Sequence, residues 1–349
     1  MSIDMKALHL PDESFWGKGD RILDPVIRQH GRSYFGVAID APAKVNLAER
    51  HTLPAFVYYM GSFQQMASRD LDKHGVIAVM DVDQNYLKVV RAGSQDGGED
   101  PDPDAPKPPN LGIVSQGYGS SAQTVELRER LELPWKPARL ILQAILLDLP
   151  SPRIETKLVS GASQFEDPEV QKFLAAERAA LNPPAPFPSV TEGAAYPSFT
   201  KEDGSAELPV TMGISLKAQR VIPVDGKAPV VLHGAWRLPM MPEDIVKPDN
   251  KEYNRTSGLL QPDGTPYAAV ATIHILVIGT SDGKPKVYRV SAPVRSVAPT
   301  GVAAGYFAID LLKMPEFPAG DQTVFVHAFA REWAADPVTI GLLNRRPQD

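Results

Sequence analysis

The sequence predicts an all-β protein made of two tandem immunoglobulin-like, Greek-key β-sandwich domains joined by a short helix and a Pro-rich linker. Three observations support this class. Apolar and β-branched runs of strand length recur along the 349-residue chain, separated by turn residues. The 34 prolines lie between those runs and are about twice an average share. A long pattern near the C-terminus also repeats an earlier one.

The chain divides by composition into four segments. We expect an N-terminal leader or arm over residues 1–32, a first sandwich over 33–160, a helix and linker over 161–206, and a second sandwich over 207–349. Strands are expected where β-branched and aromatic residues alternate between turns of Gly, Pro and Asp. In the first sandwich these are Tyr34–Ile39, Leu53–Tyr59, Val76–Val82, Tyr86–Arg91, Thr124–Leu127, Arg139–Leu147 and Ile154–Leu158.

A capped helix is expected between the two sandwiches. Asp167 can cap it, Pro168 suits the first helical position, and the helix should stop at Asn182. In the second sandwich a long loop, Met240 to Tyr267, separates the second and third strands, and loops of that length are often functional. The strands expected there are Val210–Leu216, Val230–Leu232, Ala269–Ile278, Lys286–Ser291, Ala304–Leu311, Thr323–Ala330 and Val338–Leu342.

One segment of the chain resembles another at a shift of 184 residues. Val125–Leu158 aligns on Ile309–Leu342 without a gap, and both contain an acidic residue, a Pro-containing turn and a long apolar strand at matched places. This pattern predicts a tandem duplication, the alternative being chance agreement of two generic hairpins. The matched acids, Glu126 and Asp310, are expected to be sheet-surface charges. Further upstream the echo continues at a shift of 185, where Leu53-Pro54 falls on Leu238-Pro239.

Charge and composition exclude several function classes. The net charge is −6 and no basic stripe occurs, so neither nucleic acid nor an anionic membrane is an expected partner. No cysteine is present, which excludes disulfides, thiolate nucleophiles and Cys-based metal sites. The first residues lack the apolar stretch of a signal peptide. A soluble, cytoplasmic protein is therefore expected, with leaderless export left open.

Motifs for catalysis or metal binding are absent from the sequence. The seven histidines show neither HxH nor HxxxH spacing, and GxSxG, Walker A, GxGxxG and HExxH do not occur. Asp81, Asp83 and Asn85 resemble the start of a calcium loop, but its sixth and twelfth positions hold Tyr86 and Ala92 instead of Gly and Glu. We expect no catalytic residue, no cofactor and no metal, and we lean away from an enzyme.

Two further polar features allow alternative interpretations. The acidic run over residues 96–104 could bind calcium weakly, although a solvated loop is the simpler interpretation. His327 lies in the middle of an expected strand, on one face with Phe325 and Phe329. We expect His327 to be buried and free of metal.

Aromatic residues are the remaining indication of a binding surface. Trp and Arg are enriched at the energetically important positions of interfaces. The expected interface residues are Phe15 and Trp16 in the leader, Trp236 with its neighbour Arg237, and Trp333 where a strand ends. For Trp333 a role in the core is equally expected.

The leading functional hypothesis is a non-enzymatic interaction or assembly protein that binds a protein partner or a copy of itself. It depends on the duplicated sandwich, the aromatic leader and sheet edges that need pairing or covering. A hydrolase or carbohydrate-binding protein with a site at the cleft between the domains is the alternative. An accessory subunit of a redox enzyme is the second alternative.

Overall fold

A computed structural model shows two compact units. The first comprises Met1–Asp81 and Lys88–Ala185, and the second comprises Val82–Leu87 and Pro186–Asp349. The structure describes residues 36–48, 52–93, 118–161, 168, 172, 192–193, 206–223, 229–239, 245–246, 268–281, 283–294, 296–298, 300–318 and 320–343.

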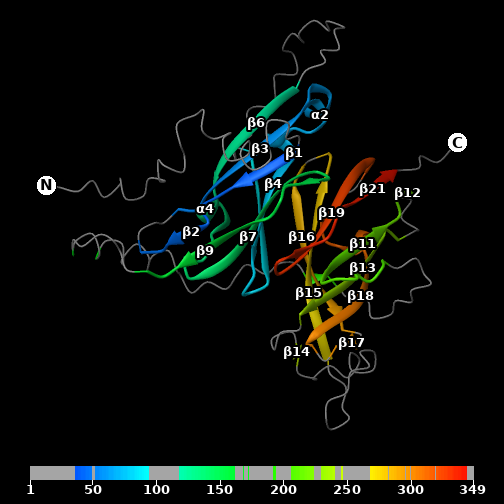
Figure 1. Cartoon of the computed structure of the whole chain (residues 1–349). Coiled ribbons are helices and arrows are strands. Elements are labelled where there is room, and N and C mark those ends of the chain that lie inside the picture. Colours follow the sequence, from blue (N-terminus) through cyan, green and yellow to red (C-terminus); the bar gives the residue numbers. More distant parts are fainter. Residues whose placement is uncertain are drawn as a thin grey trace, which may run out of the picture. The chain divides into compact units, whose positions relative to one another are not determined.

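The first unit is a sandwich of two sheets (Figure 1, blue to green). One sheet has the strand order β1-β3-β6, and the other has the order β2-β9-β7-β4-β5 with β8 paired to β7. Inward-facing residues of both sheets share one core, in which Trp135 is among the largest buried side chains. The strands are β1 Gly36–Asp40, β2 Lys44–Asn46, β3 Pro54–Ser62, β4 Gly75–Asp81, β5 Tyr86–Arg91, β6 Tyr118–Glu126, β7 Ala138–Leu146, β8 Leu149–Pro150 and β9 Ile154–Val159. The helices are α2 Phe63–Ser68, α3 Leu71–His74 and α4 Leu127–Leu131.

The second unit is built in the same way (Figure 1, yellow-green to red). One sheet has the order β11-β13-β18-β17, and the other has the order β10-β16-β15-β19-β21-β12, with β14 paired to β15 and β20 paired to β19. The strands are β10 Glu192–Gly193, β11 Gly213–Ala218, β12 Val221–Pro223, β13 Val231–Pro239, β14 Ile245–Val246, β15 Ala268–Gly279, β16 Pro285–Pro293, β17 Ser296–Val297, β18 Val302–Asp310, β19 Gln322–Ala330, β20 Trp333–Ala334 and β21 Val338–Leu343. A short 3-10 helix, η6 Leu311–Lys313, follows β18.

The two units share one strand order, since β1-β3-β6 corresponds to β11-β13-β18 and β2-β9-β7-β4-β5 corresponds to β12-β21-β19-β15-β16. Strand β1 of the first unit and strand β11 of the second each pair antiparallel within the smaller sheet of their unit. The chain then crosses to the other sheet and pairs in parallel with the last strand, β2 with β9 and β12 with β21. These two Greek-key sandwiches confirm the predicted fold class. Of the expected helix between them, Pro168 and Lys172 are described and helical.

The shift of 184 residues is visible in the backbone of both units. Glu132 and Glu316 both have positive φ angles, and so do Leu147 and Arg331. Positive φ is rare for residues other than Gly and Asn, so its recurrence at two matched pairs is strong evidence for a structural repeat.

The matched acids Glu126 and Asp310 are structural clamps, so the expectation of sheet-surface charge is wrong. Glu126 accepts hydrogen bonds from the backbone N–H groups of Leu53 (2.7 Å) and Arg128 (3.1 Å). Asp310 accepts them from Val230 (3.1 Å) and Leu312 (3.2 Å). Each carboxylate therefore caps a short helix and fixes the start of a neighbouring strand.

The upstream echo at a shift of 185 is also wrong. Because Leu53 and Val230 meet the two equivalent clamps, they are the matched residues, and the shift there is 177. Leu53-Pro54 begins β3, whereas Leu238-Pro239 lies at the end of β13. The chain from β13 to Asp310 is longer than the equivalent chain from β3 to Glu126. A few identical residues shared by two β-strands do not reveal such an insertion.

Candidate interaction surface

The edge formed by β12 and β21 exposes apolar side chains. Strand β12 is the last described strand of its sheet and pairs in parallel with β21, Val221 opposite Gly341. Ile222 and Leu342 point into the core. Since side chains alternate along a strand, Val221 and Leu343 point to the outer face, and each keeps 52 % of its surface exposed. We call these two residues, with β12 and β21 beneath them, the apolar edge.

The equivalent edge of the first unit is charged. Lys44 of β2 pairs with Lys157 of β9 at the position of the Val221–Gly341 pair. Both lysines are exposed, and the Lys157 ammonium lies 3.2 Å from the Glu155 carboxylate. Lysines are a common means of keeping an edge strand from pairing with another chain. The second unit lacks that protection at the same place.

The second unit also has exposed apolar residues outside the apolar edge. Val210 and Met212 precede β11, are both exposed, and are followed by a strand that contacts β21. The expected strand Val210–Leu216 therefore begins only at Gly213. Among the described residues, the one other large apolar side chain that is exposed is Val297, on β17 at the opposite edge of the smaller sheet.

The interface residues predicted from the sequence fall into different places. Trp236 is buried in the second core, so the expected exposure at this residue is wrong. Arg237 is half-buried and donates a hydrogen bond to the backbone oxygen of Val210. Trp333 is half-buried and packs against the core from β20. Phe15 and Trp16 lie outside the described residues.

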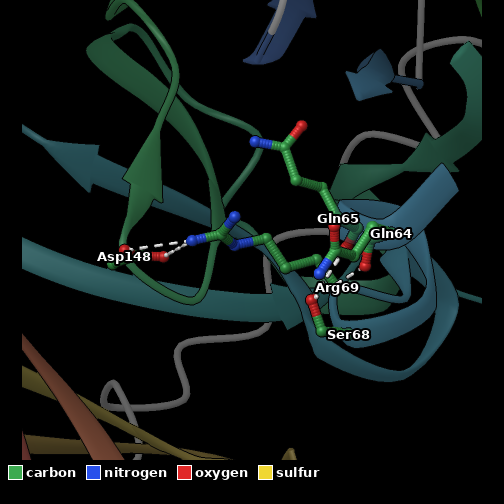
Figure 2. Close-up of polar contacts among 5 residues, drawn as sticks. All are labelled: Gln64, Gln65, Ser68, Arg69 and Asp148. Atoms are coloured by element: carbon green, nitrogen blue, oxygen red, sulfur yellow. Dashed lines mark hydrogen bonds and ion pairs between the residues drawn. The ribbon is translucent and has the colours of Figure 1, made fainter. Parts of the chain in front are cut away.

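An ion pair of the first unit links a helix end to a strand turn (Figure 2). Arg69, which follows α2, donates from Nη2 to both carboxylate oxygens of Asp148 at 2.9 and 3.2 Å. The Ser68 hydroxyl donates to the backbone oxygens of Gln65 and Gln64. Burial raises the pKa of the nearby Tyr59 hydroxyl, and the Arg69 cation opposes this only in part. Arg69 and Asp148 form a hydrogen-bonded ion pair with each other, so we assign this cluster a role in stabilising the turn.

A second polar cluster lies within the second unit around Asn85. The Asn85 side chain donates to the backbone oxygen of Thr272 (3.1 Å) and accepts from the backbone N–H of Arg331 (2.9 Å). The backbone oxygen of Asn85 lies 2.9 Å from Nε2 of His274, which must therefore donate. Burial lowers the pKa of His274 to about 4, so the ring is neutral at physiological pH. Asn85 therefore bonds to protein groups, and these contacts are structural.

A small hollow near Trp236 in the second unit also lacks catalytic character. Leu238, Ala271 and Ala303 line it together with Asn85 and Arg331. Neither a carboxylate nor a histidine lines it, so no acid–base pair faces the hollow.

The part of the chain that the structure describes contains neither a metal-binding cluster nor a membrane-spanning helix. Within those residues, no group of three or more His, Asp or Glu side chains is placed to hold a metal ion. His327 is buried on β19, as expected from the sequence. Over the same part of the chain, no helix combines the length and apolar character needed to cross a membrane. The acidic run at 96–104 lies outside the described residues.

The apolar edge was missed in the sequence because β12 is only three residues long and follows β11 closely. A signal was present: the expected final strand, Val338–Leu342, is followed directly by a second leucine, Leu343, and of two consecutive leucines only one can face the core.

Comparisons with known proteins give weak similarities. No protein family model matches the chain, and no curated protein matches its sequence. Among solved structures, the chicken interferon gamma receptor alpha chain is 10 % identical, with 88 % of this chain and 97 % of that chain covered and a TM-score of 0.18. The C-terminal domain of the Streptococcus pyogenes antigen I/II-family protein AspA is 8 % identical, with 88 % and 99 % covered and a TM-score of 0.16. An adhesin from Mobiluncus mulieris is 6 % identical, with 84 % and 80 % covered and a TM-score of 0.12. At these scores none of them carries an argument about function.

Proposed function

We propose that the chain is a non-enzymatic interaction protein that binds a protein partner, or a second copy of itself, through the apolar edge of its second unit. The observation that carries this proposal is the contrast between two equivalent edges. Lys44 and Lys157 protect the edge of the first unit, while Val221 and Gly341 occupy the same positions in the second. An unprotected edge strand with apolar side chains is a surface on which another strand can pair.

The expected contribution of the apolar edge follows from the exposure of its side chains. Fully burying a Val or Leu side chain contributes about 1.5–3 kcal/mol, and Val221 and Leu343 are each about half exposed in the isolated chain. Covering both would contribute about 2 kcal/mol, which corresponds to about thirtyfold in Kd. Backbone hydrogen bonds along the edge strand would add to this and set the register.

The test compares three variants of the full chain. Val221→Lys introduces the lysine found at the equivalent position of the first unit. Leu343→Lys places a charge at the other exposed residue of the apolar edge. Val297→Lys, on β17 of the smaller sheet, is the matched control. Light scattering measures the mass of the purified protein, and cross-linking in native extract followed by mass spectrometry identifies partners. We expect the assembly or partner of the wild type to be lost in the first two variants and kept in the control.

Two results would oppose the proposal. A wild-type chain that is monomeric and cross-links to no partner would remove the basis for an interaction protein. An assembly that survives both lysine substitutions but is lost with Val297→Lys would place the interface at β17 instead.

A further inference from the structure

Strand β6 forms one edge of the three-stranded sheet in the first unit. Its nine residues all pair with β3, from Tyr118 opposite Ser62 to Glu126 opposite Pro54, and no bulge interrupts the register. Among the described strands, none pairs with the other side of β6. Because strands are usually about five or six residues long, β6 is a long and regular edge strand. We call the side of β6 that faces away from β3 the β6 edge.

The hydrogen-bond pattern of β6 shows which backbone groups lie at the β6 edge. The N–H of Leu127 donates to the backbone oxygen of Leu53, the residue directly before β3 (2.8 Å). Successive residues of an antiparallel strand form their backbone bonds on opposite sides, so the odd-numbered residues of β6 bond to β3. Ser120, Ala122 and Thr124 therefore direct their N–H and C=O groups to the β6 edge.

The equivalent strand of the second unit shows that this side can accept another strand. At the shift of 184 residues β18 corresponds to β6, and β17 pairs antiparallel with β18. The backbone oxygen of Val302, which matches residue 118, accepts a hydrogen bond from the N–H of Ala298 (2.8 Å). In the described part of the first unit, no strand takes the place of β17.

The β6 edge also lacks the charged residues that other edge strands of the first unit carry. The larger sheet ends in β2 and β5, which contain Lys44 and Lys88. In β6, no residue from 118 to 125 is charged and none is proline. Lysine and proline are the usual means of keeping an edge strand from pairing with another chain. Ala122 and Thr124 are exposed and have short side chains, which leaves room for a second strand.

We propose that the β6 edge pairs antiparallel with the β6 edge of a second copy of the chain, with Ala122 opposite Ala122. In that register Ser120 lies opposite Thr124 of the other copy, so the residues that direct their backbone groups outward meet one another. Glu126, the one charged residue of β6, lies opposite residue 118, so that no like charges meet. The pairing joins the three-stranded sheets of two copies into one continuous sheet.

A second copy fits the β6 edge better than a foreign peptide does. When a peptide adds to a sheet, its backbone supplies the affinity and pockets for its alternate side chains supply the specificity. The short, uncharged side chains of Ala122 and Thr124 give little basis for selecting a foreign sequence. A two-fold axis at Ala122 selects a copy of the same strand, because one surface then serves both partners. The inference does not depend on the function proposed for the apolar edge.

Disulfide formation tests the register, because the chain has no cysteine of its own. Opposite residues of a hydrogen-bonded antiparallel pair have Cα atoms about 5.5 Å apart, a separation that a disulfide can span. Ala122→Cys should therefore oxidise to a covalent dimer. Thr124→Cys is the matched control: this residue is exposed on the same face of the same strand, but its two copies would lie about 13 Å apart along the strand.

Both cysteine variants are made in the full chain together with Val221→Lys and Leu343→Lys, so that association through the apolar edge does not contribute. We expect Ala122→Cys to form the covalent dimer at least about tenfold faster than Thr124→Cys, since only the first pair lies within bonding distance. Equal rates would overturn the proposal, because random collision treats two exposed cysteines alike. A faster reaction of Thr124→Cys would overturn it as well.

Sedimentation velocity over a series of concentrations gives a second measurement, in the same background without cysteine. Ala122→Lys should raise the Kd of the dimer by about tenfold or more, because the two introduced charges would lie directly opposite each other. Far-UV circular dichroism should stay unchanged, since Ala122 is exposed and its substitution leaves the pairing with β3 intact. A monomer at every concentration, or a dimer that Ala122→Lys does not weaken, would contradict the proposed pairing.

Discussion

Replacing the Glu126 clamp by Ala should destabilise the first unit by about 2–4 kcal/mol. The carboxylate accepts three backbone hydrogen bonds, from Leu53 (2.7 Å), Arg128 (3.1 Å) and Glu129 (2.6 Å). Loss of a helix cap costs about 1 kcal/mol. Leaving the N–H of fully buried Leu53 without an acceptor costs about 1–3 kcal/mol more.

Urea unfolding followed by far-UV circular dichroism would measure this loss, with the free energy extrapolated for each transition because the chain has two units. Glu129→Ala is the matched control, since it removes an exposed acidic residue from the same helix without removing the clamp. Asp310→Ala should cause a comparable loss in the second unit, where Val230 is equally buried. If Glu126→Ala cost no more than Glu129→Ala, the assignment of Glu126 as a clamp would be refuted.

Three further predictions concern stability. His274 should make the second unit less stable in acid. Its pKa is about 4 in the folded state and near 6.5 in the unfolded state, so the unfolded state binds an extra proton as the pH falls. The free energy of unfolding should therefore decrease by roughly 3 kcal/mol between pH 6.5 and pH 4. In the variant His274→Leu, the free energy of unfolding should depend less steeply on pH over that range. Gly234→Ala should lower the stability of the second unit by about 2 kcal/mol or more, because the added Cβ would lie 2.0 Å from Cζ of Phe307. The control is Gly213→Ala, whose added Cβ meets no atom within 4 Å. In thermal melts this control should be close to neutral. A double-mutant cycle of Arg69→Met and Asp148→Asn should give a coupling of about 1 kcal/mol that weakens in salt, and no coupling would mean that this pair, with side chains 23 % and 35 % exposed, contributes nothing.

The sequence predicted the central strands well, because period-two alternation is strongest where both sheets supply the core. The positions where the chain changes direction were harder. Strands β2 and β12 have three residues each, too few to show a period. The predicted strands Thr124–Leu127 and Ala304–Leu311 ran one residue too far, since Leu127 and Leu311 continue the apolar pattern but already begin short helices.

The interaction surface could be predicted only in part. Tryptophan is a residue type that is common at interfaces. The burial of Trp236, however, depends on core neighbours that are far away in sequence, such as Val294 and Phe307. The contrast between Lys44 and Val221 becomes informative only when the register of two separate strand pairs is known. An alignment of the two halves at one fixed shift hides it, because the shift changes from 177 to 184 between the paired strands.

The parallel pairing of an early strand with the last strand also affects how each unit would respond to mechanical force. In a parallel pair, the N-terminal end of one strand and the C-terminal end of the other lie at opposite ends of the pair. Tension applied between β12 and β21 would therefore load their hydrogen bonds in shear, so that these bonds must break together. Single-molecule stretching between attachment points beside these two strands would register this as a single rupture at high force, in contrast to the stepwise opening of a strand pair that is peeled from one end.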